Sequence, residues 1–133
     1  MDAVAHETVA AARLTDERQD HMQETPKRMK RLVREWAGIA HDRDLRRALS
    51  ELRVEFDRWD RAEIDSFELN RAIHQFHDGT SREIWKRYAT SDLEPAIACA
   101  VAAGVVQHEE LPAELVAHVA SLIQFYTADY PSA

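Results

Sequence analysis

Apolar residues in segment 26–60 recur every three or four positions, and no proline interrupts them after Pro26. This spacing is typical of an amphipathic α-helix. The residues form two successive stripes, Met29, Leu32, Val33, Trp36 and Ala40, then Leu45, Leu49, Leu52, Phe56 and Trp59. At about 100° per residue, the second stripe is rotated by roughly 140° from the first. Either the helix breaks between Gly38 and Asp44, or one continuous helix presents apolar faces on two sides. We favour the continuous helix, since a lone glycine costs a helix only about 1 kcal/mol.

Segment 25–90 carries signals for where its helices begin and end. Thr25 followed by Pro26 predicts a helix start, because proline lacks only an N–H that the first turn does not use. Asp65 followed by Glu68 forms a capping-box pattern and predicts a helix from Ser66. Gly79 predicts the end of that helix. Thr80 with Glu83 predicts the start of a further short helix, so that a sharp corner exposes the residues around Gly79.

The last forty residues have the pattern of a helical hairpin. Ser91 or Asp92 is placed to cap one helix, Pro112 to open the next, and Pro131 to end regular structure. Nothing in the chain alternates as a strand does. The sequence therefore predicts an all-α protein, a single-domain helical bundle of about five helices. Residues 25–130 would form this domain, and residues 1–24, whose apolar positions are sparse, would form a poorly anchored tail or helix.

Composition excludes several classes of function. With Cys99 as the lone cysteine among 133 residues, no internal disulfide or multi-cysteine metal site can form. The three glycines are too far apart for a phosphate-binding loop. No segment resembles a secretion signal, and the longest apolar run, 96–106, is too short to span a bilayer. These features favour a cytoplasmic protein that does not enter a membrane and needs no cofactor.

Charge is distributed unevenly along the chain. Residues 25–62 hold eleven basic and seven acidic residues, whereas residues 91–133 hold six acidic residues and no Lys or Arg. Five cations gather within eight positions, namely Lys27, Arg28, Lys30, Arg31 and Arg34. In the first turns of a helix such cations oppose the macrodipole, so the helix alone does not explain them. Three explanations remain open: pairing with acidic segments of this protein, an acidic protein partner, or a polyanion. The net charge of −7 disfavours a dedicated nucleic-acid binder.

Two histidines on the predicted helix after Asp65 are the main candidates for chemistry. His74 and His77 stand three positions apart, and Asp78 follows directly. Two imidazoles at this spacing with a carboxylate could bind a divalent metal. Alternatively, His74 is simply exposed and His77 forms a hydrogen bond across the helix end. The chain has no HExxH motif and no Glu-x-x-His pair of the di-iron type.

The dipeptides His41-Asp42 and His77-Asp78 suggest a second metal hypothesis. In an all-helical chain, this pattern is similar to that of the HD-type metal phosphohydrolases. The resemblance implies His41, His77 and Asp78 as metal ligands, with Asp129 as a further candidate. The match departs from that family because Gly79 follows the dyad and because polar residues precede it.

Longer stretches are similar to a family of small, uncharacterised bacterial all-helical proteins. They read REWAGIAHDRDLRRAL and RAIHQFHDGTSREIWKRY, and the similarity covers roughly residues 26–126. It implies a bacterial cytosolic protein and no particular activity. Because the long helix is apolar on two sides, we expect a non-catalytic interaction module that forms a homodimer. The alternatives are a metal-dependent phosphohydrolase, and a protein that binds an acidic partner or polyanion through residues 27–34.

Overall fold

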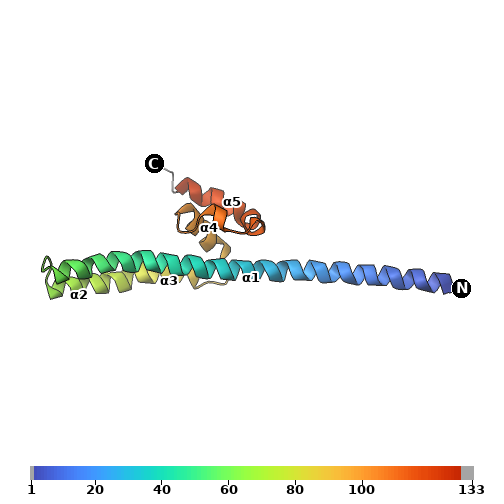
Figure 1. Cartoon of the computed structure of the whole chain (residues 1–133), viewed down its shortest axis with the longest axis horizontal. Helices are drawn as coiled ribbons and strands as arrows, with labels where there is room; N and C mark the ends of the chain where they lie inside the picture. Colours follow the sequence, from blue (N-terminus) through green and yellow to red (C-terminus); the bar gives the residue numbers. More distant parts are fainter. Residues whose placement is uncertain (1, 130–133) are drawn as a thin grey trace. The chain divides into compact units, whose positions relative to one another are not determined.

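The computed structural model describes the backbone of residues 2–129 and the side chains of residues 26–128. Its elements are α1 (Asp2–Asp60), α2 (Ser66–Gln75), the π-helix η1 (Phe76–Ser81), α3 (Arg82–Tyr88), α4 (Glu94–Ala102), the 3₁₀-helix η2 (His108–Glu110) and α5 (Ala113–Asp129), shown in Figure 1. No strand occurs among these residues, which confirms the all-α prediction. None of the described helices is both long enough and apolar enough to cross a membrane.

The chain divides into two compact units, Met1–Leu32 and Val33–Ala133. The sequence had suggested a boundary near residue 24, before a helix that begins at Thr25 and Pro26. That helix start is wrong, because Pro26 lies inside α1. Residues before Pro26 include many strong helix formers, among them Ala, Leu, Glu, Gln and Arg. Their propensity lets the helix continue through a proline, which removes one backbone hydrogen bond.

Within the second unit, α1 is continuous through Gly38 to Asp44, as we predicted. The buried positions follow one face of α1, and after Val33 they are mainly small: Ala37, Ala40, Asp44 and Ala48. The second apolar stripe is much less covered. Leu49 is 51% exposed and Phe56 is 40% exposed. The helix therefore does present apolar residues on two sides, and its own chain buries only one of them well.

The segment from α2 to α3 corrects the predicted corner. Asp65 caps α2 as expected, accepting a hydrogen bond from the Glu68 N–H at 2.8 Å. Gly79, however, does not end the helix, because α2, η1 and α3 follow one another without a break. The second predicted cap is also absent: Ser81 precedes α3 in helical conformation and no side chain caps that helix.

Register explains why the helix takes a π-turn here. In a regular α-helix, Ile84 would lie about 80° around the axis from Phe76. A π-turn holds about one extra residue, which brings Ile84 to within roughly 20° of the Phe76 direction. Ile84 is buried, on the same side as buried Leu69. The polar FHDGTS stretch thus inserts one residue and keeps one apolar face along the whole segment.

The C-terminal elements pack as the predicted hairpin of α4 and α5. Leu93, rather than Ser91 or Asp92, precedes α4, and Pro95 lies in its first turn. The turn after α4 uses Gly104 at φ +74°, in the left-handed region that glycine adopts readily. The most deeply buried large side chains are all in this part of the fold: Ile97, Val106, Leu115 and Val119. Pro131 lies outside the described residues.

Candidate functional site

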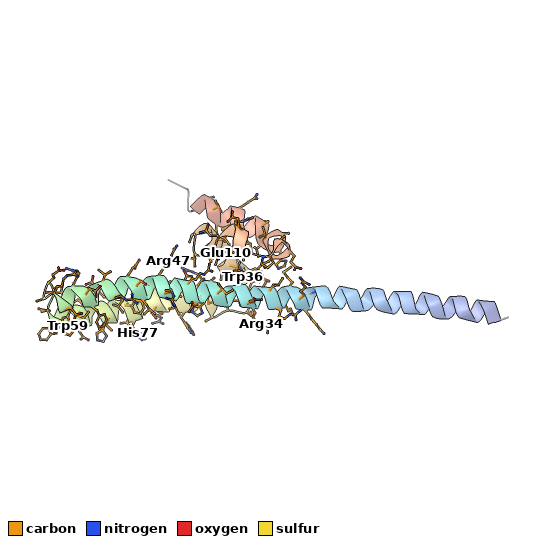
Figure 2. All side chains as sticks on the ribbon, viewed as in Figure 1. Arg34, Trp36, Arg47, Trp59, His77 and Glu110 are labelled. Atoms are coloured by element: carbon orange, nitrogen blue, oxygen red, sulfur yellow. The ribbon has the colours of Figure 1, made fainter. Side chains whose placement is uncertain are left out.

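The predicted metal ligands lie on the surface of the α2–η1 segment. His74 is in the last turn of α2, and His77 and Asp78 are in η1 (Figure 2). All three side chains are exposed. Neither histidine has a hydrogen bond or ion pair with another described side chain. The two imidazoles are therefore accessible, and the protein itself holds neither of them in a fixed position.

Of the residues in the phosphohydrolase hypothesis, His41 has a contact with another described side chain. The His41 ring stacks on Tyr88, with centroids 4.6 Å apart and planes 9° apart. Among the described residues, no group of three or more His, Cys, Asp or Glu side chains is arranged to hold a metal ion. The Asp129 side chain lies outside the described set. A metal site at these residues stays a prediction.

A buried polar cluster joins α1 to α3, and the sequence analysis missed it. The Tyr88 hydroxyl donates a 2.5 Å hydrogen bond to Asp44 Oδ2, and Arg87 Nη1 donates one of 3.2 Å to the same oxygen. Among the described residues of α1, Asp44 is the one buried charged residue, with 9% of its surface exposed. Burial, together with the hydrogen bond to Asp44, raises the pKa of the Tyr88 phenol. Tyr88 therefore stays protonated at neutral pH, and it acts as a fixed donor to Asp44.

The arrangement of this cluster suits anchoring better than catalysis. One oxygen of Asp44 accepts both hydrogen bonds, and the Tyr88 ring is covered by His41. Every buried polar side-chain atom among the described residues has a hydrogen-bond partner. None of these atoms is therefore left unpaired for a ligand to bind. A signal for this cluster was present in the sequence. Asp44 falls on the same helical face as Ala37, Ala40 and Ala48, where a carboxylate needs a partner.

A second polar link joins α1 to the C-terminal hairpin. Arg43 donates to both carboxylate oxygens of Glu110, at 2.8 and 2.9 Å, and to the Val105 carbonyl at 3.3 Å. One turn later, Arg47 donates to the Gly104 carbonyl at 3.2 Å (Figure 2). The hydrogen bond from Arg43 and that from the Gln107 N–H lower the pKa of Glu110 to about 2. These contacts fix the hairpin on α1 around residues 43–47.

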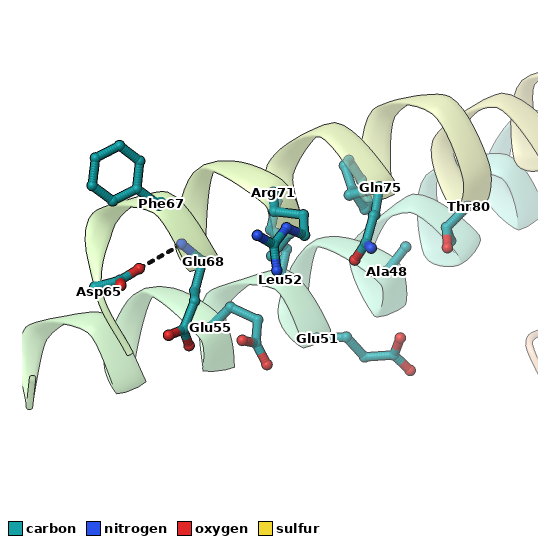
Figure 3. Close-up of a pocket in the computed structure, with 12 residues that line it drawn as sticks. Ala48, Glu51, Leu52, Glu55, Asp65, Phe67, Glu68, Arg71, Gln75 and Thr80 are labelled. Atoms are coloured by element: carbon teal, nitrogen blue, oxygen red, sulfur yellow. Dashed lines mark hydrogen bonds between the residues drawn. The ribbon is translucent and has the colours of Figure 1, made fainter. Parts of the chain in front are cut away.

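A groove lies between α1 and the α2–η1 segment. It has a volume of about 760 Å³. Its apolar lining comes from Ala48, Leu52, Phe67, Ala72 and Phe76, and its polar lining from Glu51, Glu55, Asp65, Glu68, Arg71, Gln75 and Thr80. In Figure 3 the carboxylates of Glu51, Glu55 and Glu68 lie along the lower edge of the view. With four acidic side chains and one basic one, the groove is negatively charged. We call this surface the acidic groove.

Aromatic side chains around the acidic groove are strongly exposed. Phe67, at its edge, is 81% exposed, and Trp59 at the end of α1 is 41% exposed. The Trp59 Nε1–H donates to the Ser66 hydroxyl at 3.0 Å, which ties the two helices together next to the groove. Large aromatic residues exposed in one region are characteristic of binding surfaces, whereas scattered ones are common on any protein.

The predicted basic cluster is exposed on α1. Lys27, Arg28, Lys30, Arg31 and Arg34 all have exposed side chains (Arg34 is labelled in Figure 2). Because α1 begins at Asp2, the cluster lies in the middle of the helix and not in its first turns. The macrodipole acts only at helix ends, so the predicted conflict with the dipole is wrong. Lys27, Lys30, Arg31 and Arg34 form no ion pair with the other described side chains.

The chain matches no protein-family model, no curated protein and no solved structure.

Proposed function

We propose that this protein is a non-catalytic helical interaction module that works as a homodimer, in which a second copy completes the helical bundle. The observation that carries the proposal is the poor cover of residues 49–60 of α1. Here α2 and η1 supply the neighbouring helix, and four large apolar side chains of α1 stay between 40% and 52% exposed, namely Leu49, Val54, Phe56 and Trp59.

Two helices side by side can bury only the stripe that runs between them. Residues 33–48 of α1 are better covered, because α3 reaches Asp44 and the C-terminal hairpin reaches Arg43 and Arg47. In the proposed dimer, the part of α1 after residue 48 and its neighbouring helix would form one half of a four-helix bundle. Bundles of this kind commonly arise when two helical hairpins pack together around a shared core.

The non-catalytic part of the proposal rests on the chemistry of the described polar groups. The Asp44 carboxylate accepts hydrogen bonds from Tyr88 and Arg87. Among the described residues, His74, His77 and Asp78 do not form a group arranged to hold a metal ion. Elemental analysis of protein purified without a histidine tag tests this directly. We expect no stoichiometric metal and no rise in melting temperature on adding Mn²⁺, Fe²⁺ or Zn²⁺. Bound metal with a raised melting temperature would favour the phosphohydrolase alternative.

The dimer is tested with one aromatic substitution and a matched control. Phe67→Ala removes an exposed ring at the acidic groove, and Phe125→Ala removes a ring of α5 that is 65% exposed. In an isolated chain, both changes should be nearly neutral, since neither ring is buried. By sedimentation velocity, we expect Phe67→Ala to weaken the dimer about tenfold or more, as truncation of an aromatic interface residue commonly does. Phe125→Ala should leave it unchanged. Equal behaviour of the two variants would contradict an interface at the groove.

A further inference from the structure

The turn between α1 and α2 holds an alanine in a conformation that alanine rarely adopts. Ala62 has a φ of 58°, in the left-handed region that suits glycine. The Glu63 N–H donates to the Arg58 carbonyl at 2.8 Å, and the Ala62 N–H donates to the Trp59 carbonyl at 3.0 Å. These two hydrogen bonds are the pattern of a helix end whose left-handed position usually carries glycine. The turn is therefore strained at Ala62.

The sequence of this turn favours a helix instead. Arg61, Ala62 and Glu63 belong to the strongest helix-forming residue types, and no glycine or proline lies between Gly38 and Gly79. At residues 61–65 the local preference and the observed backbone therefore disagree, which is unusual in a natural sequence. We call residues 61–65 the hinge.

The buried faces of α1 and α2 also share one helical phase across the hinge. In a straight helix, positions that alternate by four and three residues lie along one side. One such series runs without a shift through the side of α1 that meets α2, through the hinge, and through the buried side of α2 and η1: Ala48, Leu52, Glu55, Trp59, Ala62, Ser66, Leu69, Ile73 and Phe76. A hairpin does not require this agreement, because its two helices can have any relative phase. A helix running straight through the hinge would present one continuous seam to a partner helix.

A small set of contacts in the hinge keeps the single chain folded back on itself. Ile64 is 7% exposed, and Asp65 caps α2. The Trp59 Nε1–H also donates to the Ser66 hydroxyl. A straight helix would lose these contacts, but it would gain helical hydrogen bonds and release the strain at Ala62.

We propose that the hinge straightens into helix and that two copies then exchange residues 66–129, so that α2 to α5 of each copy pack on α1 of the other. The affinity needs no new interface, because contacts of the closed chain are remade between the copies, among them Tyr88 with Asp44 and Glu110 with Arg43. Two copies that exchange one segment each form a closed dimer. This inference rests on the proposed homodimer and says how its two copies are joined.

The distance between two labels on one chain distinguishes the two forms. Ser50→Cys and Gln75→Cys place spin labels at exposed positions of α1 and α2, in a chain whose own thiol is removed by Cys99→Ala. Neighbouring helices lie about 10 Å apart, which keeps the labels of the hairpin within about 25 Å of each other. A straight helix separates the same residues by about 38 Å.

The labelled chain is refolded from urea with a large excess of unlabelled protein, so that a dimer holds at most one labelled chain. Pulsed electron paramagnetic resonance then measures the distance within that chain. At concentrations where sedimentation shows a dimer, we expect the separation of about 38 Å.

Substitutions in the hinge should shift the balance in opposite directions. Ala62→Gly relieves the left-handed strain and weakens a straight helix, so we expect the population with the long distance to fall about tenfold or more. Asp65→Ala removes a cap that only the hairpin needs, so that population should rise about fivefold. Ala120→Gly is the matched control, because it makes the same change at an exposed position of α5, which both forms contain. It should leave the two populations unchanged.

Three results would overturn parts of this account. If sedimentation shows a dimer while the labels stay within about 25 Å, the exchange is overturned and the homodimer stands. If the long distance appears but Ala62→Gly and Ala120→Gly affect it equally, the hinge is overturned as the place where the chain opens. If the unchanged protein stays monomeric up to about 100 μM, far above typical micromolar affinities, the exchange and the homodimer are both overturned.

Discussion

Asp44 is the residue whose surroundings account best for the position of α3 on α1. It is buried, it is charged, and its Oδ2 accepts hydrogen bonds from Tyr88 and Arg87. We predict that Asp44→Ala lowers the free energy of unfolding by about 1–3 kcal/mol, because the partly buried Tyr88 hydroxyl and Arg87 guanidinium lose their acceptor. Tyr88→Phe should cost only about 1–2 kcal/mol, since the ring and its stacking on His41 remain. Urea denaturation measures both. A loss below about 1 kcal/mol for Asp44→Ala would contradict this account.

Glu110 gives stability a defined dependence on pH. Its pKa is lowered from an ordinary 4.5 to about 2, first by the hydrogen bond from Arg43 and then by that from the Gln107 N–H. A carboxyl group with a lowered pKa in the folded state stabilises the protein above the unfolded-state pKa. The stabilisation is lost as the pH falls through the folded-state value.

We therefore predict that Glu110→Gln is less stable than the unchanged protein at pH 7, and that the difference disappears between about pH 4.5 and pH 2. Denaturant unfolding at pH 7, 4 and 2.5 measures this. Glu109→Gln is the matched control, because Glu109 is adjacent, exposed and without an ion pair to another described side chain. A stability difference for Glu110→Gln that stays constant down to pH 2 would show that the Arg43 contact does not contribute through charge.

At the scale of elements, a substitution at Gly79 tests whether this residue lies inside a helix, as in η1, or ends one, as the sequence predicted. If Gly79 ended a helix in left-handed conformation, an alanine there would be strained. In the structure its φ is not positive, it lies inside a helical segment, and nothing lies within 4 Å of an added Cβ. We predict that Gly79→Ala raises the free energy of unfolding by about 0.5–1 kcal/mol, because alanine loses less backbone entropy.

Gly104→Ala is the control for this substitution. Gly104 has equal space around it but a φ of +74°, so alanine should destabilise the protein there by about 1 kcal/mol or more. Thermal or urea unfolding of both variants distinguishes them. If Gly79→Ala destabilised the protein as much as Gly104→Ala does, the result would contradict a helix that continues through Gly79 and would favour the helix end that the sequence predicted.

The elements show which features local sequence determines. Continuity of α1, the Asp65 cap and the helical hairpin after residue 93 follow from periodicity and capping residues, and all could be predicted. The passage of helices through Pro26 and Gly79 could not. In both places, a residue that locally favours an end is outweighed by its neighbours, through helix propensity before Pro26 and through the shared apolar face of Leu69, Phe76 and Ile84.

The candidate sites also differ in whether they could be predicted from the sequence. The basic residues 27–34 could be found from sequence, because they are consecutive on one helix. The acidic groove could not, since Glu51 and Glu68 belong to different helices and only the packing of α2 on α1 brings them to one surface. Nor could the link from Asp44 to Tyr88, which spans 44 residues. His74, His77 and Asp78 are close in sequence and exposed, but among the described residues they do not form a group arranged to hold a metal ion.

At the scale of the whole molecule, the central claim is that one chain does not complete its own core. Leu49, Val54, Phe56 and Trp59 of α1 and Phe67 of α2 are left exposed. Stability and association should then be coupled, because binding of a second folded copy stabilises the folded state by mass action. We predict that the melting temperature rises with protein concentration. A melting temperature independent of concentration would be the result for a self-sufficient monomer.

The most direct measurement is sedimentation equilibrium of the unchanged chain at concentrations from about 1 to 100 μM, a range that brackets typical dimer affinities. The account predicts a mass that rises with concentration to twice the 15.3 kDa of the monomer and goes no further, because a two-fold contact closes. A mass that stays at 15.3 kDa throughout would contradict it.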